Sequence, residues 1–184
     1  MGSVIAILLF GSIVVILLCF ASMFWFGGLL LPLFFKGGPF VPSSNKRTQT
    51  MIRLANIKPT DRVVDLGSGE GKFLVEAIRA GAQSAEGYEI HPGLVVYSRL
   101  RAKLNKMQNK IKIHQRSFWK ADVSNATIVF LYQLPDHMQK LQDKLEKELP
   151  IGARVISNTF SFPTWLPIKQ EEKTYVYEQT KKER

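Results

Sequence analysis

Residues 63–73 read VVDLGSGEGKF, an apolar run that passes into three alternating glycines and then into a helical pattern. This order predicts a buried β-strand, a sharp turn and the N-terminus of a helix. Gly67, Gly69 and Gly71 have no Cβ, so they permit sharp turning and close approach of a ligand to the backbone. The helix N-terminus adds free N–H groups and a partial positive charge. The stretch therefore predicts a site for a nucleotide-like ligand.

Carboxylates near this turn distinguish between ligands. Asp65 ends the strand and Glu70 lies inside the turn, where two negative charges would repel a phosphate. No glycine stands at position 72 and no Gly-Lys-Ser/Thr ending follows, so a pyrophosphate is a poor ligand. S-adenosylmethionine fits better, because Asp65 can favour its cationic end and the turn amides can receive its carboxylate. Glu89, 24 positions after Asp65, is placed to accept hydrogen bonds from ribose hydroxyls, a contact that a dinucleotide would share.

Strand and helix patterns alternate on both sides of the glycine turn. Strands are predicted at 62–66, 85–90, 111–114, 126–132 and 153–160, and helices at 46–57, 71–79, 92–104 and 137–149. Tyr175 and Tyr177 are predicted to lie in an additional edge strand. Alternating β and α units predict a Rossmann-like α/β fold, with a mostly parallel sheet and helices on both faces.

The N-terminal segment has a different composition. Residues 2–35 contain no Asp, Glu, Lys, Arg or His, and the apolar run Val4–Leu31 exceeds the roughly 20 residues that span a hydrocarbon layer. A cleaved signal peptide is the alternative, but no Lys or Arg precedes the run and it is longer than the usual h-region. We expect a transmembrane anchor at 1–35, a linker and helix at 36–60, and a ligand-binding domain at 61–180. Basic residues follow the run, which favours a cytoplasmic domain.

Composition limits the partners and cofactors. The formal charge of +10 suggests an anionic partner, but the uncharged N-terminus means that all side-chain charge lies in the remainder, and we expect no nucleic acid. Arg99 to Lys112 contains six basic residues, interpreted as a solvated face, with anionic lipid or an acidic partner as alternatives. Cys19 is the single cysteine and the three histidines are widely spaced, so neither a disulfide nor a metal site is predicted.

A family resemblance extends these inferences. VVDLGSGEGK followed by EGYEI resembles motif I and the next acidic motif of class I (seven-strand) S-adenosylmethionine-dependent methyltransferases. PFVPS, GYEIHPGLVVYSRLRA, SFWK and ARVISNTFSFPTW together resemble one family, the membrane-anchored protein-lysine methyltransferases that include the ATP synthase c-subunit and adenine nucleotide translocase lysine methyltransferases. The similarity covers Pro39 to Trp165.

The resemblance implies a cofactor site for S-adenosylmethionine. Its residues would be Asp65, Gly67, Ser68, Gly69, Gly71, Glu89, Ile90, Ser117, Phe118, Phe40 and Pro42. Ser117 and Phe118 fall where the family usually has an acidic residue and a leucine, so the contact to the adenine amino group is weakened or reassigned. Phe40 and Pro42 resemble a segment that folds over the cofactor, although a plain linker has the same composition.

The acceptor site is expected at the carboxyl end of the fourth strand. Tyr132 and Pro135 would position the acceptor there, although a half-buried sheet tyrosine is an equally good interpretation of Tyr132. The resemblance implies a protein substrate with a lysine acceptor, and the anchor implies contact with a lipid bilayer. Methylation of a lipid or small membrane-soluble molecule, non-catalytic cofactor binding and a nicotinamide dehydrogenase remain as alternatives.

Overall fold

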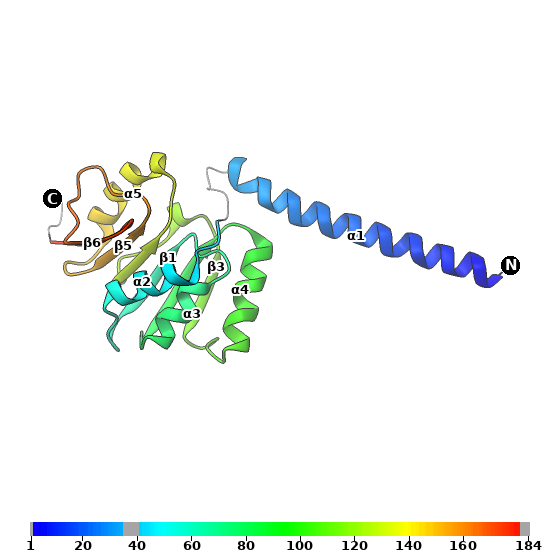
Figure 1. The fold of residues 1–184 in the computed structure, drawn as a ribbon, viewed down its shortest axis with the longest axis horizontal. Coiled ribbons are helices and arrows are strands. Elements are labelled where there is room, and N and C mark those ends of the chain that lie inside the picture. Colours follow the sequence, from blue (N-terminus) through cyan, green and yellow to red (C-terminus); the bar gives the residue numbers. More distant parts are fainter. Residues whose placement is uncertain (1, 35–40, 181–184) are drawn as a thin grey trace. The chain divides into compact units, whose positions relative to one another are not determined.

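The structure is a computed structural model that describes residues 2–34 and 41–180 (Figure 1). It contains two compact units, Met1–Pro39 and Phe40–Arg184. In the first unit, helix α1 (Gly2–Phe34) has 33 residues, enough to extend about 50 Å. Its segment Leu8–Trp25 is long and apolar enough to cross a membrane, and none of it is buried by protein. Ser12 and Ser22 donate their hydroxyls to carbonyls within the helix, so these polar groups are satisfied internally.

The second unit is a seven-stranded sheet with helices packed on it. Its strands are β1 (Arg62–Leu66), β2 (Ser84–Glu89), β3 (Ile111–Gln115), β4 (Ile128–Leu131), β5 (Arg154–Asn158), β6 (Lys169–Glu171) and β7 (Thr174–Glu178), in the spatial order β3-β2-β1-β4-β5-β7-β6. The helices are α2 (Asn45–Ala55), α3 (Lys72–Arg79), α4 (Pro92–Leu104) and α5 (Pro135–Glu148), with a short 3-10 turn, η1 (Phe118–Lys120). β1 to β5 are parallel, and β7 runs antiparallel to both of its neighbours. The predicted α/β fold is confirmed.

The carboxyl-terminal strands differ from the prediction in one respect. Tyr175 and Tyr177 lie in β7, which is paired on both sides, so the predicted edge position is wrong. The edge strand at this end of the sheet is β6, whose three residues Lys-Gln-Glu carry no apolar pattern. Tyr177 is completely buried against the rings of Phe162 and Trp165, and its hydroxyl accepts a hydrogen bond from Phe162 N–H at 3.0 Å.

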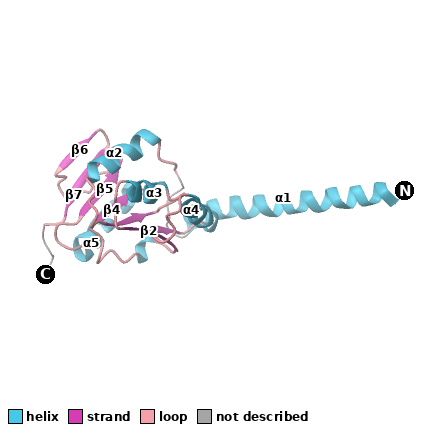
Figure 2. Ribbon diagram, turned by 90° about the horizontal axis from the view of Figure 1, so that it is seen from below, coloured by secondary structure: helices cyan, strands magenta, loops and turns pink. Residues whose placement is uncertain are grey.

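Alternating residues of the strands build a separate core on each face of the sheet. In β4, Ile128 and Phe130 belong to the core under α2, α3 and α4, whereas Val129 and Leu131 belong to the core under α5. Successive side chains of a strand point to opposite faces, so a continuous apolar strand requires cover on both. Figure 2 shows this cover, with α5 on one side of the strands and α2 and α3 on the other.

A buried polar network joins the amino ends of three neighbouring strands. Asp61 precedes β1, Thr127 precedes β4 and Arg154 begins β5. The Asp61 carboxylate accepts hydrogen bonds of 2.7 Å from the Lys58 N–H, the Thr127 hydroxyl and the Arg154 guanidinium. Burial alone would raise the pKa of Asp61, but these three donors outweigh it and lower the pKa below its usual value. The network stabilises the end of the sheet opposite the glycine turn.

Candidate functional site

The glycine turn follows β1 at the carboxyl edge of the sheet. Gly67, Gly69 and Gly71 have φ angles of 90°, 51° and 73°, a region that side chains disfavour. The N–H groups of Gly67 and Ser68 both donate to the Tyr88 carbonyl of β2, at 3.0 and 3.1 Å. A Cβ on Gly71 would lie 2.2 Å from Ser98 Oγ on α4. Glycine at position 71 is therefore needed for both the turn and the close approach of α4.

Asp65 is the unusual carboxyl of the turn. Its side chain is 4% exposed, and its Oδ2 has no hydrogen-bond partner among the described residues. Burial, and then the charge of Glu89, raise the pKa of Asp65 to about 8. The group is therefore mostly protonated at neutral pH. A buried acid without a partner is costly, and a cationic ligand beside it would restore the charged form.

Glu89 is held in place by the backbone around it. One carboxylate oxygen accepts a hydrogen bond from Gly69 N–H at 2.9 Å, and the other accepts one from His91 N–H at 2.8 Å. A carboxylate has about four lone-pair sites, so each oxygen keeps acceptor capacity for a ligand hydroxyl. Ile90, half-buried, connects this strand end to α4. The structure thus brings Asp65, Glu89 and the glycine turn together, as predicted from their spacing.

Glu70 was expected to repel a phosphate in the turn, but its charge is neutralised by another residue. Its carboxylate forms an ion pair of 2.8 Å with Arg101 on α4. The guanidinium of Arg101 also lies 5.2 Å from the centroid of the Tyr97 ring. Glu70 therefore fastens the turn to α4, and its charge is balanced by Arg101. Asp65 and Glu89 alone carry the argument about ligand charge.

Ser117 and Phe118 lie just beyond β3, next to the end of β2. The two strand ends are joined by a hydrogen bond of 3.0 Å from Arg116 N–H to the Glu89 carbonyl. Ser117 is half-buried and its side chain caps nothing in η1. Phe118 is buried in the core under α5, with its ring centroid 4.7 Å from that of Trp119. Of this pair, only Ser117 offers a polar group at the edge of the predicted cofactor site.

The segment before α2 approaches the glycine turn. Phe40 lies outside the described residues, and Pro42 is exposed in the coil 41–44. The carbonyl of Ser43 accepts a hydrogen bond of 2.8 Å from the Lys72 ammonium, which follows Gly71 directly. This bond holds the coil beside the N-terminus of α3. This role was not predicted for Lys72, although its position as a basic residue directly after the third glycine could have indicated it.

The predicted acceptor residues follow β4. Tyr132 is half-buried, and the Arg47 guanidinium of α2 lies 6.0 Å from its ring centroid. Pro135 is exposed at the first position of α5. Between them, Gln133 donates a hydrogen bond of 2.7 Å to the Leu66 carbonyl at the end of β1. The connection from β4 to α5 is thereby fixed beside the glycine turn.

Asn158 ends β5, the strand next to β4, and sequence reasoning missed it. It is fully buried, and its Nδ2 has no hydrogen-bond partner within residues 41–180. The following residue, Thr159, has a φ of 71°, which turns the chain sharply at the same edge. An amide without a partner at the carboxyl edge can donate a hydrogen bond to a ligand. The sequence could have indicated this role for Asn158 only if the position of β5 beside β4 had been known.

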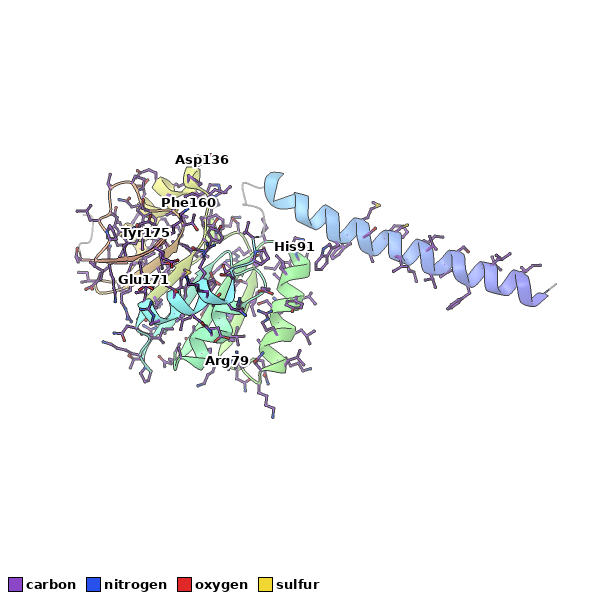
Figure 3. The ribbon with its side chains drawn as sticks, viewed as in Figure 1. Arg79, His91, Asp136, Phe160, Glu171 and Tyr175 are labelled. Atoms are coloured by element: carbon purple, nitrogen blue, oxygen red, sulfur yellow. The ribbon has the colours of Figure 1, made fainter. Side chains whose placement is uncertain are left out.

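All these groups gather at one edge of the domain. In Figure 3, His91 at the start of α4 and Asp136 at the start of α5 mark this edge, and Arg79 at the end of α3 marks the opposite one. Ligands of open α/β sheets bind beyond the carboxyl ends of the strands. Across residues 2–34 and 41–180, no group of three or more His, Cys, Asp and Glu side chains could hold a metal ion.

Comparisons with known proteins agree with this geometry. The ANTKMT methyltransferase domain model matches residues 65–169. The chain is 36% identical over 130 residues to the adenine nucleotide translocase lysine N-methyltransferase of Mus musculus, covering 71% of this chain and 56% of that protein. It is 36% identical over 129 residues to the ATP synthase c-subunit lysine N-methyltransferase of Homo sapiens, covering 70% and 54%. The chain thus spans about half the length of these relatives.

A solved structure extends the likeness to the whole domain. An RNA methyltransferase from Salinibacter ruber, crystallised with S-adenosyl-L-homocysteine, superposes with a TM-score of 0.75 at 33% identity. The match covers 78% of this chain and 97% of that one.

Proposed function

Because this chain belongs to the ANTKMT methyltransferase family, whose members are class I, S-adenosylmethionine-dependent methyltransferases, we propose that it transfers a methyl group from that cofactor to the side-chain amine of a protein lysine. The single observation that carries the proposal is the buried Asp65 carboxyl, whose Oδ2 has no hydrogen-bond partner within residues 2–34 and 41–180, beside Glu89 and the glycine turn. The lysine acceptor is supported by the names of the two relatives, which are both lysine N-methyltransferases.

The residues of the turn fit the cofactor. Asp65 would face its cationic amino-acid end, and Glu89 would accept hydrogen bonds from the ribose hydroxyls. The N–H groups of Gly67 and Ser68 donate to the Tyr88 carbonyl and that of Gly69 donates to Glu89, so these residues would contribute close backbone approach to the cofactor instead of free N–H groups. Gly71 keeps α4 close enough to complete the wall.

Further contacts to the cofactor come from the neighbouring strand ends. Ile90 and Phe118 would supply apolar surface, and Ser117 would supply a weak contact to the adenine. The coil that contains Pro42 would cover the cofactor, held there by the bond from Lys72 to Ser43. Phe40 is proposed for the same cover on the family resemblance alone.

Methyl transfer requires little covalent help from the protein. The bound cofactor supplies an activated methyl group on a sulfonium, so catalysis consists mainly of in-line positioning of the amine and exclusion of water. The lysine amine must be neutral to offer its lone pair. Arg47, whose guanidinium lies over the Tyr132 ring, places a positive charge beside the proposed acceptor and so disfavours the ammonium form. Tyr132 would orient the amine through its hydroxyl, and Pro135 would shape the entrance.

We also propose that α1 anchors the chain in a membrane. Its apolar window Leu8–Trp25 supports this by length and composition. The anchor would occupy residues 1–35, followed by a linker and helix at 36–60 and the catalytic domain at 61–180. The basic residues after α1 favour a cytoplasmic domain in a single-pass arrangement. A membrane protein would then be a suitable substrate.

Isotope transfer tests the proposal. The full chain, inserted in lipid nanodiscs, would be incubated with methyl-labelled S-adenosylmethionine and a membrane extract. We expect protease-sensitive label, with mass shifts of one to three methyl groups on lysine. Label in the organic extract would instead favour a lipid or small-molecule acceptor. Tight cofactor binding without turnover would indicate a non-catalytic protein.

RNA is a second candidate acceptor. The Salinibacter protein is described as an RNA methyltransferase and matches across nearly its whole length. Nuclease-sensitive label in the same experiment would favour RNA over protein.

A further inference from the structure

The positive charge of this chain is concentrated in one continuous segment. Residues 90–121 contain eight Lys and Arg and no Asp or Glu, which leaves 17 basic against 15 acidic residues in the rest of the chain. The segment forms α4, the edge strand β3 and η1, so the charge lies at one end of the sheet. Lys103, Lys106, Lys110 and Lys112 are exposed, and none of them forms a salt bridge within the described part of the chain.

An apolar stripe lies on α4 within this basic region. Val96, Leu100 and Leu104 are 65%, 50% and 74% exposed, and residues four apart share one face of a helix. Tyr97, also exposed, lies beside the stripe. The opposite face of α4 packs on the sheet through four small or apolar residues, Leu94, Val95, Ser98 and Ala102. The helix is therefore apolar on two faces, and only one of them is covered by the protein.

Basic residues flank the stripe on both sides. On a helix, Arg99 and Lys103 fall on one side of the stripe and Arg101 on the other. Between α4 and β3 lies an open hollow, which is lined by Arg99 and Lys112 together with the apolar Ile111 and Ile113. Cations around aliphatic surface are the pattern of helices that lie in a membrane interface, with the apolar face at the acyl boundary and the cations at anionic headgroups.

We propose that the stripe Val96, Leu100 and Leu104, with its basic flanks, is a second membrane contact that seats the domain on an anionic lipid surface. The proposal rests on the proposed anchor α1, because a tethered domain needs only a weak additional contact. Ten residues separate Phe34 from Asn45, a chain that reaches about 35 Å at most, so the domain stays near the bilayer that holds α1. Nucleic acid fits the charge but not the exposed aliphatic side chains, which would lie against phosphates.

This contact would set the orientation of the active site. α4 begins at Pro92, three residues after Glu89, and Arg101 on α4 is paired with Glu70 in the glycine turn. A helix that rests on lipid would therefore hold the cofactor edge of the sheet close to the bilayer surface. The substrate class that fits this geometry is a lysine near the headgroup level of a membrane protein.

Lipid-dependent quenching tests the contact directly. In a Cys19→Ser background, Leu104→Cys would carry an environment-sensitive fluorophore, and Leu166→Cys, in the connection between β5 and β6, would serve as the matched control because Leu166 is also highly exposed, at 83%. The full chain would be inserted in vesicles that contain a quencher at the upper acyl chain. We expect quenching at position 104 to be about twofold greater in vesicles with phosphatidylglycerol than in pure phosphatidylcholine, and unchanged at position 166.

Charge variants test whether the basic segment 90–121 that contains the stripe causes the lipid dependence. Lys106→Glu with Lys110→Glu should abolish the difference between the two lipids, whereas Lys140→Glu with Lys147→Glu on α5 should leave it intact. Equal quenching in both lipids, quenching that follows protein density, or a response of the 104 label to RNA but not to anionic vesicles would overturn the proposal. Flotation with the vesicles reports the anchor, and label transfer to lysine reports the proposed function, so failure of either is distinguishable from failure of this contact.

Discussion

Lowering the pH should weaken cofactor binding in a way that identifies Asp65. With a pKa of about 8, this carboxyl is roughly one-tenth ionised at pH 7 and one-hundredth at pH 6. A cationic ligand binds to the ionised form, so the Kd for S-adenosylmethionine should rise about tenfold for each pH unit below 7.5, or about 1.4 kcal/mol per unit. Binding at pH 7 should release about 0.9 proton for the same reason.

Isothermal titration of the full chain in nanodiscs measures both quantities. Titrations at pH 6.0, 6.5 and 7.0 give the slope, and buffers of different ionisation enthalpy give the released proton. Measurements stop at pH 7.5, because an α-amino group on the ligand loses its own proton near 7.7 to 8.0. Asp65→Asn keeps the size of the side chain but removes the ionisable group. This variant should bind weakly with no pH slope.

The same carboxyl should make the cofactor-free domain less stable as the pH rises, which is the opposite of the usual effect of an Asp. The folded pKa of Asp65 is raised, so its folded form holds a proton that the unfolded chain loses above about pH 4. Stability is therefore lost as the pH rises from about 4 to 8, by about 4 kcal/mol at most by pH 7. Cofactor-free Asp65→Asn should melt at a higher temperature than the wild-type chain at pH 8. A slope that persists in Asp65→Asn, or binding without proton release, would refute the assignment.

Four further substitutions separate the functions at the carboxyl and amino ends of the strands. Gly71→Ala should destabilise the domain by about 2 kcal/mol or more and abolish cofactor binding, because its Cβ meets Ser98 Oγ. Gly152→Ala also has a positive φ but open space, so it should cost only about 1 kcal/mol and leave binding intact, as measured by chemical denaturation and calorimetry. Asp61→Asn should cost about 3 kcal/mol, because it removes the charged partner of the mostly buried Arg154, which keeps only its bonds to the Ala55 and Asn56 carbonyls. It should also remove the stability that is otherwise lost as the pH falls through the lowered pKa of Asp61. Tyr132→Phe should lower methyl transfer by about tenfold with the Kd of the cofactor unchanged, and an equal loss of both would contradict its role at the acceptor.

Most helices and strands could be predicted because the spacing of apolar residues indicates them. β1 has the predicted bounds, since Arg62 opens an apolar run and Gly67 closes it. β4 is shorter than predicted, although the Thr127 backbone still bonds to Arg62 and Arg154 on either side and its hydroxyl donates to Asp61. β5 ends at Asn158 because Thr159 leaves the extended region. Neither bound follows from apolar periodicity alone.

The cofactor half of the site was more predictable than the acceptor half. Asp65, Glu89 and the glycines follow from strand ends and turn chemistry, which are local. Arg101 was not foreseen as the partner of Glu70, because 31 residues separate them and only the packing of α4 brings them together. Asn158 was missed for the same reason, since its position next to β4 depends on the order of the strands.

The two open edges of the sheet have a consequence for aggregation. β3 and β6 each have one unpaired side, and unpaired strands are templates for joining one sheet to another. β3 carries an exposed Lys112, and β6 has only three residues and begins with an exposed Lys169. Short, lysine-bearing edges repel their own copies and disfavour intermolecular strand pairing. Copies crowded together on a surface can therefore collide often without polymerising through their sheets.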